Sequence, residues 1–248
     1  MVHGLPPFPD HLMENPRALW ERLLAPRQGF RARAAECPGL WEAVKGLLLA
    51  RTLPALAGLV LGYLGFVQGL SRALRMEGPL WAQVWSRLPA QVSPADLRAM
   101  TQNLPPLWSL GRVLPWLVLL APVGVLSIWL HDAVWDHMAL WLLRGLGGPG
   151  RFRVTLVADA EALKVGSIGA VAGLLKFLPG AGPGFTVLLV LVGIWFWVLR
   201  GYALAAWHGC PVWKGVVATL LHAFLMAVMV FGTLAMFAVL VLQELRMS

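Results

Sequence analysis

The chain carries five long stretches in which apolar residues dominate, separated by shorter segments rich in polar residues, glycine and proline. A transmembrane helix needs about 20 mostly apolar residues. The pattern therefore predicts five membrane spans, at about 52–70, 122–143, 156–178, 185–207 and 214–242. The third stretch is the weakest of the five, because three charged residues fall in its first half.

The second apolar stretch is long enough to allow two positions of its span. It runs from Val113 to Leu143, and Pro115 and Pro122 can break or kink a helix. A span over 113–131 leaves a cluster of histidines and aspartates at its end. The alternative, a span over about 122–143, places this cluster inside the membrane.

Residues 1–45 predict a cytosolic segment with amphipathic and basic character, in front of a membrane domain over 46–248. The stretch PRALWERLL at 16–24 places apolar residues on one helix face and charged residues on the other. A basic amphipathic segment suits the surface of anionic lipid. The alternative is a helix packed under the transmembrane bundle. The candidates for lipid contact are Arg17, Arg22, Arg31 and Arg33.

Composition supports a membrane protein and argues against nucleic acid as a partner. Of the 248 residues, 58% are hydrophobic and only 13% are charged, whereas a soluble domain carries about 25% charged residues. The net charge of +8 fits basic residues on cytoplasmic flanks. We therefore predict an all-α integral membrane protein, a bundle of five transmembrane helices. The segments expected on the same side of the membrane as the N-terminus carry more Lys and Arg than those on the other side. This bias predicts a cytoplasmic N-terminus.

Two histidines and two aspartates occur together in WLHDAVWDHMALW, residues 129–141. On a helix, Asp132 and Asp136 lie about 40° apart, while His131 and His137 lie about 100° to either side of them. The two aspartates therefore share a face, and the four side chains spread too widely to hold one ion. A metal site would need Asp132, Asp136 and one histidine, together with ligands from another helix, such as His208 or His222.

We expect neither a metal nor a cofactor, because no established metal motif is present. A carboxylate in lipid is costly unless it is paired. Lys164 is the expected partner of the aspartates, with Glu161 one turn before it. The intramembrane cluster of Asp132, Asp136, Glu161 and Lys164 is then structural, or forms a proton or ion pathway. His131, His137 and His208 are further candidates for a functional role.

Three stretches, taken in order and spacing, resemble the Yip domain family of Ypt/Rab-interacting-protein-like membrane proteins, and its bacterial branch in particular. They are RLLAPRQGFRARAAECPGLWEAV before the first span, ALWLLRGLGGPGRFRVTL after the second, and FLPGAGPG followed by LRGYALAAWHGCPVWKGVVATLL. The resemblance covers about residues 20–242. It implies five spans, a cytosolic N-terminus, the later position of the second span, and no enzymatic activity.

These observations lead to a non-enzymatic membrane scaffold or interaction protein in a bacterial inner membrane. Its expected partners are the bilayer, with anionic lipid at the N-terminal segment, and a membrane protein or a second copy of the chain. The alternative is a small ion or proton transporter that uses the charged second and third spans. A metal-dependent intramembrane enzyme comes third.

Overall fold

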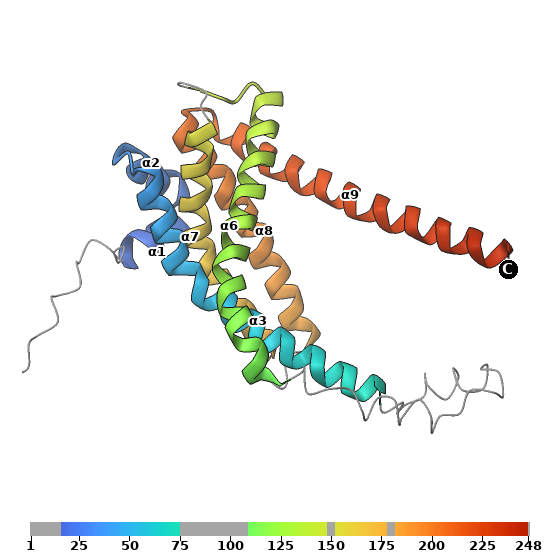
Figure 1. Cartoon of the computed structure of the whole chain (residues 1–248). Helices are drawn as coiled ribbons and strands as arrows, with labels where there is room; N and C mark the ends of the chain where they lie inside the picture. Colours follow the sequence, from blue (N-terminus) through green and yellow to red (C-terminus); the bar gives the residue numbers. More distant parts are fainter. Residues whose placement is uncertain (1–15, 75–108, 148–151, 178–181, 248) are drawn as a thin grey trace, which may run out of the picture. The chain divides into compact units, whose positions relative to one another are not determined.

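The structure is a computed structural model that describes residues 16–74, 109–147, 152–177 and 182–247 (Figure 1). These residues form α-helices and one short 3₁₀ helix, with no strand among them, which confirms the all-α prediction. The elements are α1 (Pro16–Leu24), α2 (Pro26–Ala35), α3 (Leu40–Leu74), α6 (Leu110–Leu142), α7 (Phe152–Leu174), η3 (Leu175–Phe177), α8 (Pro183–His208) and α9 (Val212–Met247).

The chain divides into two units, one over residues 52–124 and one over 1–51 together with 125–248. The smaller unit holds most of α3 and the first part of α6. Pro54, Pro115 and Pro122 lie inside these helices without ending them. Proline is tolerated in membrane helices, where neighbouring groups can satisfy the freed carbonyls. Because α6 is continuous over 33 residues, it includes both positions expected for the second span.

Four of the described helices are long and apolar enough to cross a membrane. They are Leu40–Gly69, Leu110–Leu142, Gly184–His208 and Val212–Leu240. The first, second, fourth and fifth expected spans each fall on one of these helices. The expected third span corresponds to α7 and η3, which do not reach the same apolar content because Asp159, Glu161 and Lys164 lie in α7.

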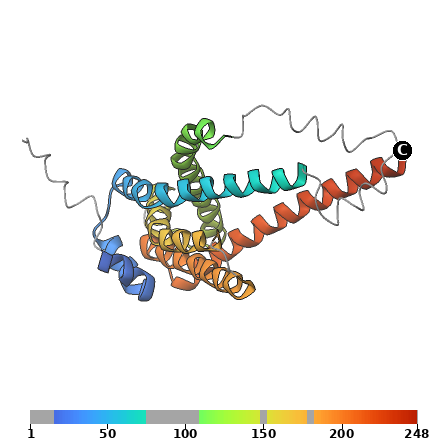
Figure 2. The ribbon, with the colours of Figure 1, turned by 90° about the horizontal axis from the view of Figure 1, so that it is seen from below.

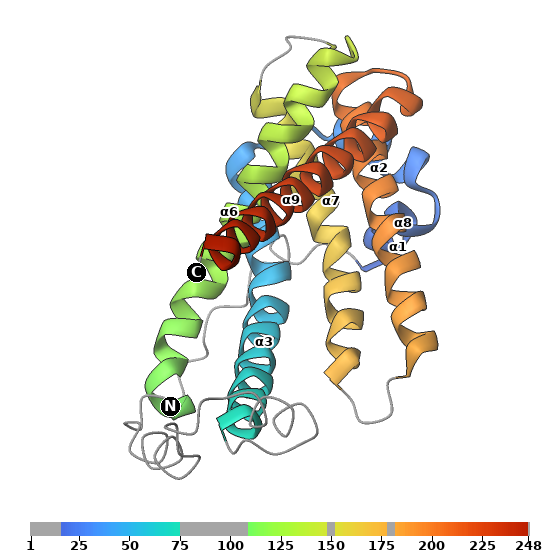
Figure 3. The ribbon, with the colours of Figure 1, turned by 90° about the vertical axis from the view of Figure 1, so that its right-hand side faces the viewer.

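Helix α7 is enclosed by other parts of the larger unit. Every residue from Val157 to Ser167 is buried, including the three charged ones. Helix α7 packs along α8 and touches α1, and both Figure 1 and Figure 3 show it beside α8. A helix segment that is buried against protein does not need an apolar face toward lipid, which explains how this part of α7 carries its three charges.

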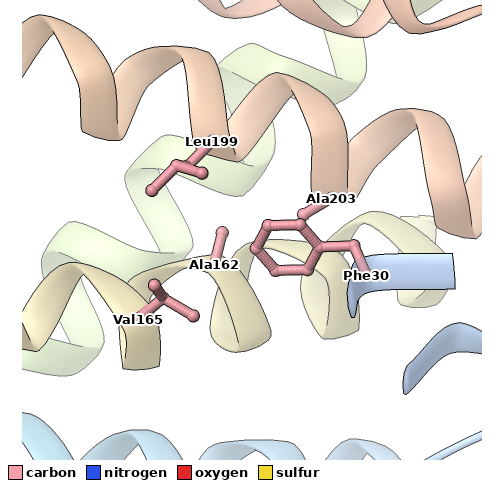
Figure 4. Close-up of a cluster of buried hydrophobic side chains, with 5 residues drawn as sticks. All are labelled: Phe30, Ala162, Val165, Leu199 and Ala203. Atoms are coloured by element: carbon pink, nitrogen blue, oxygen red, sulfur yellow. The ribbon is translucent and has the colours of Figure 1, made fainter. Parts of the chain in front are cut away.

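The N-terminal helices α1 and α2 pack on the bundle, as the alternative interpretation of this segment proposed. Phe30 of α2 is fully buried and lies in a cluster with Ala162 and Val165 of α7 and Leu199 and Ala203 of α8. Figure 4 shows the Phe30 ring reaching from α2 to these small side chains. Burying a phenylalanine side chain contributes about 1.5–3 kcal/mol, so this single residue holds α2 firmly in place.

Glycines allow α8 and α9 to approach closely. A Cβ atom on Gly215 would lie 2.1 Å from the carbonyl oxygen of Gly201, and one on Gly201 would lie 2.5 Å from the Cα atom of Val216. Small residues at such crossings are typical of membrane helices, whose association depends on close packing. Beyond this crossing α9 extends away from α7 and α8 (Figures 1 and 2), and residues 227–240 are all exposed.

Candidate functional site

A buried network of charges connects α6, α7, α8 and α9 around Arg200. Asp132 and Asp136 lie four residues apart on α6 and share one face, as the sequence predicted. Arg200 lies on α8 inside a long apolar segment. An arginine within such a segment faces the interior and pairs with other groups, because lipid does not solvate it.

Arg200 binds both aspartates of α6. Its Nε and Nη2 atoms donate to Oδ2 of Asp136 at 2.8 and 2.7 Å. Its Nη1 atom donates to Oδ2 of Asp132 at 2.8 Å. Asp136 is completely buried and Arg200 is 6% exposed. The guanidinium therefore bridges two carboxylates away from solvent, and it also lies over the Trp197 ring, 4.6 Å from the ring centroid.

His222 of α9 completes this side of the network. Its Nδ1 atom lies 2.8 Å from Oδ1 of Asp136 and 2.9 Å from Nη2 of Arg200. Arginine only donates and an ionised carboxylate only accepts, so Nδ1 accepts from Arg200 in one tautomer of His222 and donates to Asp136 in the other. Trp135 stacks on the His222 ring and Trp197 meets it edge-on. Asp136 thereby joins three helices.

Asp159 of α7 is held less closely by Arg200 than the two aspartates of α6 are. It is completely buried, and neither of its carboxylate oxygens has a hydrogen-bond partner within the described part of the chain. Oδ1 lies 3.6 Å from Nε of Arg200, beyond ordinary hydrogen-bond length. Buried polar groups without partners are rare and costly. Asp159 is therefore a position where a proton or a cation would be favourable.

Glu161 organises a second network, which ties the N-terminal helices to α7. Its Oε2 atom accepts from Nη1 of Arg22 at 2.8 Å, and its Oε1 atom accepts from Lys164 at 2.6 Å and from Arg33 at 3.3 Å. Arg33 also bonds Glu42. Although burial alone would lower the pKa of Arg33, the neighbouring Glu161 carboxylate raises that pKa above its ordinary value. One buried carboxylate thus holds three cations.

This arrangement corrects two sequence predictions. Lys164 is not the partner of Asp132 and Asp136, because Arg200 takes that place and Lys164 bonds Glu161. Arg22 is not a lipid-surface residue, because it is 1% exposed and bonds Glu161. Charged helix faces look alike in a sequence whether they meet lipid or a buried carboxylate.

The other lipid-surface candidates divide in the same way. The Arg33 side chain is 17% exposed and is held by three carboxylates. Arg17 and Arg31 are exposed, as is the neighbouring Arg27. The basic surface of the N-terminal helices is therefore smaller than expected, because Arg22 and Arg33 bond the buried Glu161.

Two of the candidate histidines meet through a threonine hydroxyl. Nδ1 of His137 lies 2.8 Å from Oγ1 of Thr155, and Nε2 of His208 lies 3.0 Å from the same oxygen. Thr155 and His208 are buried. Nδ1 of His208 has no hydrogen-bond partner in the part of the chain that the structure describes. Because Thr155 is one helical turn before Asp159, both polar clusters adjoin the same face of α7.

The third candidate histidine lies beside the Arg200 network. His131 is exposed, and its Nδ1 atom lies 3.5 Å from Oδ1 of Asp132. His131, Asp132 and His222 bring potential metal ligands from α6 and α9 within 4.8 Å of one another. His137, in contrast, lies in the cluster around Thr155. The histidines and aspartates that the sequence placed in one cluster on α6 thus belong to two separate clusters, one around Arg200 and one around Thr155.

Sequence reasoning missed Arg200 and Thr155 as members of these clusters. Arg200 carried a signal, since it stands alone among apolar residues in FWVLRGYALAAW. Thr155 gave no signal, because a single hydroxyl near the start of a helix is ordinary.

Comparison of the chain with protein-family models, curated proteins and solved structures finds no match. The resemblance to the Yip domain family therefore stays a prediction from the three sequence stretches.

Proposed function

We propose that the protein is a non-enzymatic, multi-pass membrane scaffold of the Yip type, which presents its N-terminal helices as an interaction surface. The observation that carries this proposal is the Glu161 network. It docks α1 and α2 by buried ion pairs, and removing one partner of such a pair costs about 3–5 kcal/mol. A segment held in this way keeps a fixed surface, as a scaffold requires.

The exposed side of the N-terminal segment supports the proposal. Trp20 is 52% exposed, Leu24 is 76% exposed and Trp41 is 68% exposed, and Arg17 and Arg31 are exposed nearby in the sequence. Aromatic and arginine side chains are enriched where proteins bind one another. They also suit the interface with anionic lipid, where each basic residue contributes about 1 kcal/mol.

The scaffold we propose crosses a bacterial inner membrane five times, with a cytoplasmic N-terminus. Helix α7, at 23 residues, is about 35 Å long, which exceeds a hydrocarbon core of about 30 Å. Its charged residues are buried against protein, so they do not oppose insertion as part of a bundle. The other four spans are the apolar helices already described. This arrangement keeps the two termini on opposite sides.

The proposal is tested by crosslinking together with reconstitution. A photoreactive amino acid is placed at Leu24 or, as the control, at Leu188, an exposed position within the apolar α8 helix. In native membranes, only the protein labelled at Leu24 should give a discrete crosslinked product. The purified protein in liposomes should carry no proton or cation current. Equal crosslinking at both positions would reject the N-terminal surface as the interaction site.

A second candidate, a proton pathway, is favoured by Asp159 and the neighbouring histidine pair. Asp159 has no hydrogen-bond partner among the described residues, and it lies one turn from the Thr155 hydroxyl that contacts two histidines. These groups could exchange a proton. Proton relays in membrane proteins commonly use Asp and His side chains. Proton uptake by liposomes that contain the protein, lost on Asp159→Asn and kept on Ser167→Ala, would favour this function over the scaffold.

A further inference from the structure

The His131, Asp132 and His222 side chains form a group with the chemistry of a metal site. Oδ1 of Asp132 and Nδ1 of His131 are 3.5 Å apart, and the ring centroids of His131 and His222 are 5.7 Å apart. Ligand atoms of all three residues lie within 4.8 Å of one another. Ligands of a tetrahedral zinc ion are roughly 3.3 Å apart, from metal–ligand distances of about 2.0–2.1 Å. Rotation of the exposed His131 side chain can close the remaining gap.

Asp136 prepares His222 for this role. In the tautomer with the proton on Nδ1, Oδ1 of Asp136 accepts that proton at 2.8 Å, and the Nε2 lone pair is then available to a metal ion. Within the described residues, no hydrogen bond engages Nε2 of His222. A carboxylate that orients a metal-binding histidine through its second nitrogen is the common arrangement in metalloproteins. Trp135 stacks on the same ring and restricts its movement.

The charge around these ligands favours a cation. Asp132 and Asp136 share the guanidinium group of Arg200, and Oδ1 of Asp159 lies 3.6 Å from its Nε atom. The carboxylates thus outnumber the single guanidinium group that they contact. A divalent ion at Asp132 would reduce this imbalance through space.

We propose that His131, Asp132 and His222 bind a divalent transition-metal ion, with Asp136 as the positioning residue. Two histidines and one carboxylate suit Zn²⁺, Fe²⁺ or Mn²⁺, and leave at least one position for water or another ligand. His131 is exposed, so an ion can reach the group from the surface at this residue. The ion would fasten α6 to α9, and the proposal holds for a scaffold and for a transporter alike.

Metal binding to the full-length, untagged protein in detergent tests the proposal. After treatment with a chelator, the protein is titrated with ZnCl₂ and with MnCl₂ by calorimetry, and its metal content is measured after dialysis. His131→Asn is the principal variant, because the exposed side chain can be changed without loss of the fold. His137→Asn is the matched control on the same helix, since His137 lies in the Thr155 cluster.

We expect one ion per chain in the wild-type protein, and a dissociation constant at least about tenfold higher in His131→Asn. His137→Asn should bind as the wild type does. Protein loaded with Co²⁺ should show visible d–d absorption that His131→Asn lacks, which separates loss of a ligand from a general loss of stability. The proposed metal site would be refuted if the wild type bound no stoichiometric ion, or if His131→Asn bound the metal with unchanged affinity.

Discussion

Replacing Arg200 by methionine should destabilise the protein strongly, because it removes the cation that two buried carboxylates share. Methionine keeps an unbranched side chain of similar length but has no hydrogen-bond donor. The change removes all three bonds to Asp136 and Asp132 and the contact with the Trp197 ring. Asp136 is then a buried carboxylate whose remaining contact is His222.

The size of the effect follows from burial. Removing one partner of a buried ion pair costs about 3–5 kcal/mol. Asp136 is completely buried, whereas the side chain of Asp132 is 14% exposed and loses less. The remaining contact of Asp136 with His222 offsets part of the cost, which places the expected loss near the lower end of the range. For a chain of this size, each kcal/mol lowers Tm by about 2–4 °C, so Tm should fall by at least about 6 °C.

The double variant Arg200→Met with Asp136→Asn gives the decisive comparison. Replacing both partners of a buried pair is less harmful than removing one, so the second change should recover about 1.5–3 kcal/mol as coupling energy. Thermal unfolding in one detergent at a fixed heating rate measures this. Arg153→Met, at an exposed position of α7, should stay within about 0.5 kcal/mol of the wild type. A double variant less stable than the sum of both single changes would refute the pairing.

Three further changes test other parts of the structure. Gly215→Leu should lower stability by about 1–3 kcal/mol or more, because α8 leaves no room there, whereas Gly193→Leu, with open space around it, should be neutral by thermal unfolding. Burial raises the pKa of the Cys210 thiol, and the thiolate is the form that reacts with maleimide. Near pH 7 maleimide should therefore modify the exposed Cys37 first, and its reaction with Cys210 should become faster as pH rises. Equal rates at the two cysteines would contradict the placement of Cys210. Glu161→Gln removes the carboxylate shared by three cations. Protease cleavage in α1 and α2 should become at least about tenfold faster, which corresponds to about 1.4 kcal/mol in the free energy of opening this segment. Unchanged cleavage would show that the ion pairs do not hold the segment.

The apolar pattern was sufficient to predict four of the long helices, because a helix that can cross a membrane needs apolar residues along its own length. It also predicted that Asp132 and Asp136 share a face, which depends only on helical geometry. The partner of these aspartates could not be obtained in this way. Lys164 is nearer in sequence, but Arg200 of α8 is the residue that meets them, and which helices become neighbours depends on packing across the whole bundle.

The same limit applies to α7 and to the N-terminal segment. A sequence shows that α7 has charged residues, but it does not show that α1, α2 and α8 cover them. Arg22 looked like a residue for lipid contact because its helix is amphipathic. Its burial follows from one acidic residue, Glu161, that lies 139 positions later in the chain.

The distance along the chain between Arg200 and Asp136 has a consequence for biosynthesis. The two residues are 64 positions apart, and at about 5–20 residues per second a ribosome needs about 3–13 seconds to produce the arginine after the aspartate. During this interval α6 carries carboxylates whose permanent partner does not yet exist. Nascent chains that stop before α8 should therefore be recognised by membrane proteases, and completion of α8 marks the point at which the protein becomes resistant to them.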